Sequence, residues 1–133
     1  MVDDFSQTEL DLLEVTESTN PEKRLKLIEN ITRYEFNAWY GSKYNNRWYT
    51  ASDGAFLFMI VEIDDWNNPS FNLTVREFIV KKGETLHIPP GFAVGFKSLD
   101  NKAFLKCLIE GKYPENLDTY VYDKSRWYFE TFM

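Results

Sequence analysis

The residues best suited to bind a small molecule gather in a short stretch between positions 39 and 49. Among its side chains are four aromatic residues and two cations that could form a binding surface, namely Trp39, Tyr40, Lys43, Arg47, Trp48 and Tyr49. Aromatic rings can stack on a sugar or a base, and the two cations can pair with a phosphate. The same rings could instead fill the interior of a closed barrel. The residues alone leave both alternatives open.

Two further side chains have the chemistry of a reactive group. His87 is the only histidine, and it could act as a general base in a cleft, although a hydrogen-bonded structural histidine is the more common case. Cys107 lies in the apolar stretch 103–109, which predicts a buried structural thiol and not a nucleophile.

Length and charge limit the class of protein. A chain of 133 residues with a net charge of −6 is long enough for one domain with its own core. Seven of the 21 acidic residues and none of the 15 basic ones fall within residues 1–22, so we expect an acidic extension at 1–24 and a folded domain at 25–133. No basic stripe exists to bind nucleic acid. The sequence shows no membrane-spanning run and no signal-peptide pattern, which predicts a cytoplasmic protein.

The elements that would position these residues are short strands. Residues 25–28, 32–36, 55–63, 71–80, 92–96 and 119–122 have strand patterns, and residues 6–9 have the form of a helix capping box. Pro89, Pro90 and Gly91 predict a rigid corner between two strands, and Asp100-Asn101 predicts a tight hairpin. Residues 112–117 are expected to form a loop. About eight short strands separated by turns indicate an all-β sandwich or jelly-roll barrel.

The stretch 83–96 also resembles the second conserved motif of the cupin barrels. The spacing from Gly83 through Pro89 and Gly91 to Val94 is that of the motif, in which a metal-binding histidine stands at the last position. Setting Gly54 as the end of the first cupin motif places the other three ligand positions at Tyr40, Ser42 and Arg47. Transition metals need imidazole, thiolate or carboxylate donors. We therefore expect no metal and no other cofactor.

Within the cupins, residues 33–128 resemble the RmlC-like enzymes of nucleotide-linked sugars, which are the dTDP-4-dehydrorhamnose 3,5-epimerases and the sugar 3,4-ketoisomerases. The likeness is strongest at 54–70 and 86–99. The segment Arg-Gly-Trp-His-Gly-His-Lys of small relatives is similar to residues 37–43, where Trp39, Gly41 and Lys43 match. The family's arginine is replaced by Asn37, and its two histidines are replaced by Tyr40 and Ser42.

The resemblance implies an activity and a set of site residues. In the family a histidine removes a proton next to the sugar's 4-keto group, and a tyrosine acts on the opposite face. Here Tyr40 stands in place of the base, and Tyr113 resembles the family's tyrosine with its register shifted by about one residue. Tyr40 and Tyr113 are thus the predicted acid and base. The predicted substrate-binding residues are Trp39, Ser42, Lys43, Arg47, Trp48 and His87.

Two functions remain open from the sequence. One is an epimerase or ketoisomerase of a dTDP-linked 4-keto-deoxysugar that supplies a surface polysaccharide. The other is a catalytically inactive cupin that binds a nucleotide sugar or a partner enzyme. In both cases the expected small-molecule partner is a nucleotide-linked sugar. The expected assembly is a homodimer, because the family pairs its barrels edge to edge.

Overall fold

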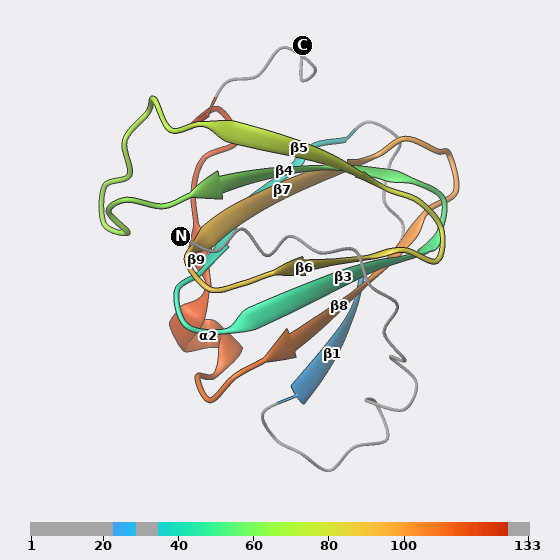
Figure 1. The fold of residues 1–133 in the computed structure, drawn as a ribbon, viewed down its shortest axis with the longest axis horizontal. Coiled ribbons are helices and arrows are strands. Elements are labelled where there is room, and N and C mark those ends of the chain that lie inside the picture. The colour runs from blue at the N-terminus through green and yellow to red at the C-terminus, as the bar shows by residue number, and fades with distance from the viewer. Residues whose placement is uncertain (1–22, 29–34, 128–133) are drawn as a thin grey trace.

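The computed structural model describes residues 23–28 and 35–127, and these residues form an all-β fold with one short helix (Figure 1). The elements are β1 (Lys23–Ile28), β2 (Asn37–Ser42), β3 (Asn46–Asp53), β4 (Phe56–Glu62), β5 (Val75–Val80), β6 (Thr85–Ile88), β7 (Phe92–Ser98), β8 (Phe104–Glu110), α2 (Glu115–Asp118) and β9 (Tyr120–Val121). No helix within these residues is long and apolar enough to cross a membrane.

The strands make two antiparallel sheets that face each other (Figure 1). One sheet has the order β1-β8-β3-β6, and the other has the order β5-β4-β7-β2-β9. The predicted jelly-roll barrel is confirmed. The predicted hairpin at Asp100-Asn101 is wrong, because β7 pairs with β2 and β4 whereas β8 pairs with β1 and β3. Residues 99–103 therefore carry the chain from one sheet to the other.

The inner faces of both sheets form the first of two hydrophobic clusters. It includes the aromatic rings of Tyr49, Phe56, Phe58 and Phe96, whose centroids lie 5.2 to 6.3 Å apart. Aromatic pairs at such separations add to the free energy of burial. Side chains thus fill the middle of the barrel. Space for a ligand therefore has to lie at one of the two ends of the barrel.

A second cluster covers the outer face of the five-stranded sheet. Trp39, Met59, Val61 and Trp127 belong to it, and the two indole rings meet edge to face with their centroids 5.1 Å apart. Because β4 is covered on both faces, residues 56–61 are buried without interruption. This explains why the sequence of β4 is a continuous apolar run and not an alternating one.

Several local expectations can be compared with these elements. The Pro89-Pro90-Gly91 corner is confirmed between β6 and β7, and Gly91 has a φ of 107°. Strand β5 begins at Val75, four residues later than expected, because residues 71 and 72 form a turn. The sequence pattern did not anticipate β2, β3 or helix α2. The proposed N-terminal helix and most of 32–36 lie outside the described residues.

Candidate functional site

The four positions that match the cupin ligand positions all face the inside of the barrel. Tyr40 on β2 lies opposite Val94 on β7, and Val94 belongs to the inner cluster. Arg47 on β3 lies opposite Ile88 on β6, which also belongs to that cluster. Side chains two residues apart on a strand share a face, so Ser42 points the same way as Tyr40. The positions that the cupin spacing identifies in the sequence therefore share the inner face of the barrel.

Arg47 is held at the centre of a network of hydroxyl groups. Its side chain is 6% exposed. Its Nε donates a hydrogen bond to Ser42 Oγ over 2.7 Å, its Nη1 donates to Tyr49 Oη over 3.4 Å, and its Nη2 donates to Thr119 Oγ1 over 3.2 Å. These bonds fix the planar guanidinium group in one orientation. Burial raises the pKa of the Tyr49 phenol far above its ordinary value, which keeps the phenol neutral.

The barrel end that carries this network is called the mouth here. It is formed by residues 43–45, 63–74, 89–91 and 111–119. The β2–β3 turn, the end of β4 and helix α2 all lie at this end, on the left of Figure 1. Loops at one end of a sheet scaffold commonly carry the functional groups of such folds, and the mouth is therefore where the binding of a ligand has to be sought.

A buried carboxylate holds the β2–β3 turn in place. Asp118 is 1% exposed. It accepts hydrogen bonds from the backbone N–H groups of Lys43, Tyr44 and Asn45 at 2.9 to 3.2 Å. The next residue, Thr119, accepts the bond from Arg47. The last residue of α2 and the residue after it thus position both the turn and the buried cation.

The segment 122–127 similarly holds the β4–β5 loop. Tyr122 donates its hydroxyl proton to the carbonyl of Trp66 over 2.7 Å, and Trp127 donates from Nε1 to the carbonyl of Ser70 over 2.8 Å. Arg126 donates to the carbonyl of Pro69 and lies over the ring of Phe71, 4.1 Å from its centroid. The loop that borders the mouth is therefore fixed mainly through its backbone.

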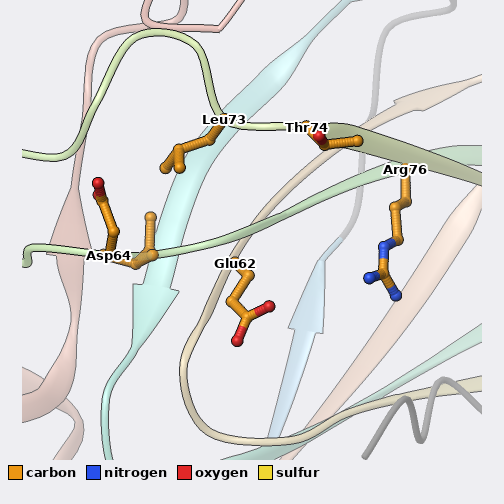
Figure 2. Close-up of a pocket in the computed structure, with 6 residues that line it drawn as sticks. Glu62, Asp64, Leu73, Thr74 and Arg76 are labelled. Carbon is orange, nitrogen blue, oxygen red and sulfur yellow. The ribbon is translucent and has the colours of Figure 1, made fainter. Parts of the chain in front are cut away.

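A cavity of about 350 Å³ opens between the end of β4 and the start of β5. It is lined by Glu62, Ile63, Asp64, Leu73, Thr74 and Arg76. Figure 2 shows the Glu62 carboxylate and the Arg76 guanidinium group projecting to the same side of the two strands. A volume of this order suits a small ligand. None of these six residues was predicted from the sequence to belong to a site.

The two tyrosines predicted as acid and base have different surroundings. Tyr40 is half-buried and packs against the inner cluster. Tyr113 is 45% exposed and stacks on Tyr44, with the ring centroids 4.3 Å apart. The ammonium group of Lys43 lies 5.4 Å from the centre of the Tyr44 ring. Tyr44, Tyr113 and Lys43 therefore form an aromatic and cationic rim, whereas Tyr40 lies deeper.

Three of the predicted binding residues lie on the outer faces of the sheets. Trp39 is fully buried in the outer cluster, and its Nε1 donates to the carbonyl of Lys124 over 3.3 Å. Trp48 and His87 pair across β3 and β6 and stack with their centroids 4.5 Å apart. His87 Nε2 also lies 2.9 Å from Asn46 Oδ1. Strand alternation places Trp48 and His87 opposite to the inward-facing Arg47 and Ile88.

The structure adds residues that the sequence analysis did not single out. Asp118 and Thr119 are more than 70 positions from the residues they bind, and no local pattern marks such a contact. Glu62 did carry a signal, because it is the charged residue that ends the apolar run of β4. Within the described residues, no three or more His, Cys, Asp or Glu side chains form a group that could hold a metal ion.

No protein-family model matches the chain, and no curated protein matches it in sequence. Solved structures do match its fold. One is a mutant of the 3,4-ketoisomerase QdtA from Thermoanaerobacterium thermosaccharolyticum in complex with TDP-4-keto-6-deoxyglucose. It has 13% sequence identity and a TM-score of 0.57, over 72% of this chain and 63% of that one. The chain thus spans less than two thirds of that protein.

Two further structures match in the same way. A dTDP sugar isomerase from Desulfovibrio desulfuricans has 12% identity and a TM-score of 0.61, over 88% of this chain and 73% of that one. RmlC from Streptococcus suis in complex with dTDP-D-xylose has 13% identity and a TM-score of 0.53, over 81% of this chain and 57% of that one. The fold of this chain is therefore that of the RmlC-like cupins, whose matching members are isomerases and epimerases of dTDP-linked sugars.

Proposed function

We propose that this chain is a nucleotide-sugar-modifying cupin, an epimerase or ketoisomerase of a dTDP-linked 4-keto-deoxysugar. The observation that carries the proposal is the inward-facing group Tyr40, Ser42 and Arg47 at the mouth of a barrel with the RmlC-like fold. By the sequence resemblance, these residues stand at positions where the family has its catalytic and ligand groups. The matching structures include a ketoisomerase and an RmlC in complex with dTDP-linked or TDP-linked sugars.

Tyr40 is the proposed acid–base residue. A base at this position takes the proton from the carbon next to the 4-keto group, and the electron pair moves into the C–O bond to give an enolate. Return of a proton to the opposite face inverts that carbon. The ketone moves instead when the proton of the neighbouring hydroxyl group passes to the former carbonyl oxygen and a proton is added to the former carbonyl carbon. Arg47 lies nearby on the inner face, where a fixed cation can stabilise the negative oxygen of the enolate. Tyr113, the predicted second tyrosine, stays a prediction.

The rim of the mouth suits the nucleotide end of the substrate. The exposed rings of Tyr44 and Tyr113 offer a surface on which a base can stack, and Lys43 supplies a cation for the diphosphate. The proposal needs no metal or redox cofactor, because both reactions only move protons. We further propose that the protein acts in the cytoplasm, as a homodimer, in the supply of deoxysugars for a surface polysaccharide.

Proton exchange with solvent provides the test. The protein is incubated in heavy water with dTDP-4-keto-6-deoxyglucose, and proton NMR follows the signals of the carbons beside the ketone. We expect these signals to disappear with time, and Tyr40→Phe to abolish the loss. Tyr44→Phe is the matched control, because it removes a hydroxyl group at the mouth but keeps the stacked ring.

The outcomes separate enzyme from binder. No exchange above the protein-free control would contradict an isomerase or epimerase acting on this substrate. If the ligand signals then broaden in the presence of the protein, the chain is the inactive nucleotide-sugar binder that the sequence left open. If Tyr40→Phe still catalyses hydrogen exchange at these carbons, the chain is an enzyme but Tyr40 is not its acid–base residue.

A further inference from the structure

Two hydroxyl groups from the opposite sheet orient Arg47. Arg47 lies on β3 in the four-stranded sheet, whereas Ser42 ends β2 and Thr119 directly precedes β9, both in the five-stranded sheet. Nε of Arg47 donates a hydrogen bond to Ser42 Oγ over 2.7 Å, and Nη2 donates one to Thr119 Oγ1 over 3.2 Å. The direction of the guanidinium group therefore depends on contacts across the barrel and not on β3 alone.

The two hydroxyl groups belong to facing positions of β2 and β9. These strands are antiparallel, and Gly41 pairs with Tyr120. Continuing the register by one residue puts Ser42 opposite Thr119. The guanidinium group of Arg47 is planar and carries its N–H donors in a fixed fork. One acceptor fixes a single point of such a group, whereas two acceptors also fix the direction in which it points.

Thr119 is itself held by the residues on both sides of it in the chain. Asp118 accepts hydrogen bonds from the backbone N–H groups of residues 43–45, and Tyr120 pairs with β2. Threonine is branched at Cβ, which limits its rotamers. The hydroxyl group of Thr119 is therefore ordered before a ligand binds, which is what an orienting group requires.

The proposed chemistry makes the direction of Arg47 important. A cation stabilises an enolate oxygen best when it is already aimed at that oxygen, because no reorganisation is then needed during the reaction. A misplacement of about 1 Å can lower a rate about a hundredfold. Loss of one of the two orienting contacts should therefore slow the chemical step and leave the binding of the nucleotide unchanged.

We propose that Thr119 is a positioning residue of this reaction. Its hydroxyl group holds the guanidinium group of Arg47 in the direction that stabilises the enolate, without contact to the substrate. The inference rests on the proposed function and adds a residue that lies outside both cupin motifs. Because Thr119 follows Asp118, the two residues that fix the β2–β3 turn also set the geometry of the inner cation.

Exchange kinetics of two Thr119 variants test this role. The proton-exchange assay with dTDP-4-keto-6-deoxyglucose gives kcat and KM for wild type, Thr119→Val and Thr119→Ser, and calorimetry gives Kd for dTDP. We expect Thr119→Val to lower kcat about tenfold, the effect of one hydrogen bond, while KM and Kd stay at the wild-type level. Thr119→Ser keeps the hydroxyl group and should restore most of kcat.

Thr50→Val is the matched control. It is the same substitution on β3, and it removes the contact of 2.6 Å between the hydroxyl groups of Thr50 and Thr85. Strand alternation places Thr50 on the face opposite to Arg47, so kcat should stay at the wild-type level although a hydrogen bond is lost. Equal loss of kcat in Thr50→Val and Thr119→Val would mean that general loosening of the fold slows the reaction, which contradicts the proposal.

A spectroscopic measurement reports the orientation of Arg47 without substrate. Rotation about the Nε–Cζ bond exchanges the two Nη groups, and nitrogen-15 NMR measures its rate, with the spectrum of Arg47→Lys to assign the signals. We expect this rate to rise about tenfold in Thr119→Val and to stay at the wild-type level in Thr119→Ser and Thr50→Val. An unchanged kcat or an unchanged rotation rate in Thr119→Val would overturn the positioning role. If wild type catalyses no exchange, the proposed function fails for this substrate, and the rotation rate alone then decides whether Thr119 orients Arg47.

Discussion

Arg47 donates a hydrogen bond from Nε to the hydroxyl oxygen of Ser42 over 2.7 Å, inside the barrel. Both residues stand at positions that the sequence resemblance aligns with ligand positions of the cupin motifs. In this chain a cation and a hydroxyl group occupy these positions, and their hydrogen bond joins β3 to β2.

Removing either partner of this pair should destabilise the fold. Removing both should lower the free energy of unfolding by less than the sum of the two single losses. We expect Ser42→Ala and Arg47→Met each to lower the free energy of unfolding by about 1 to 3 kcal/mol, with a coupling of about 1 kcal/mol in the double variant. Urea unfolding of the four proteins measures these values. If the two losses in the free energy of unfolding were strictly additive, the hydrogen bond between Arg47 and Ser42 would contribute nothing to stability.

Among the side chains at the mouth, Asp118 should be the one whose substitution destabilises the fold most. Asp118→Ala leaves three backbone N–H groups of residues 43–45 without their acceptor. We expect the free energy of unfolding to fall by about 3 kcal/mol. Asp118→Asn should cost about half as much, because one oxygen acceptor remains. Asp123→Ala is the control, since its carboxylate is exposed and bonds only Ser125 among the contacts described. A larger loss in Asp123→Ala than in Asp118→Ala would refute this assignment.

Alkaline pH should destabilise the protein through two phenols, the buried Tyr49 and the partly buried Tyr122. Burial raises the pKa of Tyr49 well above the usual value, and it raises the pKa of Tyr122 to about 12. Tyrosine in the unfolded chain ionises near pH 10, so the unfolded state releases protons first as the pH rises. The stabilisation is complete below about pH 10 and declines above it, by about 1.4 kcal/mol per pH unit for Tyr49.

Urea unfolding at several pH values between about 8 and about 11 checks this slope. Tyr49→Phe should flatten the decline, and the double variant with Tyr122→Phe should flatten it further. Absorbance of phenolate in the native protein should report ionisation of Tyr49 only together with unfolding. A slope in Tyr49→Phe equal to that of the wild type would count against burial of a neutral phenol as its cause.

Gly41 should not tolerate a side chain. A Cβ atom at this position would lie 2.6 Å from Cζ3 of Trp66, whose loop borders the cavity. We expect Gly41→Ala to lower the free energy of unfolding by about 1 to 3 kcal/mol, because the indole ring has to move. Gly83→Asn is a useful comparison, since Gly83 has a φ of 88° with no atom within 4 Å of its would-be Cβ, and Asn accepts this conformation. A milder effect at Gly41 than at Gly83 would contradict the close contact.

The sequence was informative about the fold and about part of the site, for physical reasons that differ. Proline and glycine act locally, so the corner at Pro89-Pro90-Gly91 was predictable. The resemblance to the first cupin motif grouped Tyr40, Ser42 and Arg47 as ligand positions, and in the structure all three face the inside of the barrel. The crossing after Ser98 was not predictable, because a short polar connection looks the same whether it joins neighbours in one sheet or strands in two.

The remaining site residues depend on contacts between distant parts of the chain. Six strands, β3 to β8, separate Asp118 from residues 43–45 in the sequence. Residues 46–53 were not recognised as a strand, and without the strand the alternation that separates Arg47 from Trp48 could not be applied. The cavity at Glu62 and Arg76 follows from the point where β4 and β5 stop pairing, which the side-chain pattern of 71–80 placed four residues too early.

The segment after β8 holds both mouth loops largely by their main-chain atoms. Asp118 binds the N–H groups of residues 43–45, and Tyr122, Arg126 and Trp127 bind the carbonyl groups of residues 66–70. Main-chain atoms are the same in every amino acid, so most side chains of these loops can be exchanged without loosening the attachment. A mouth built in this way can acquire a new specificity by substitution alone, which is consistent with a barrel that keeps its shape at 12 to 16% sequence identity.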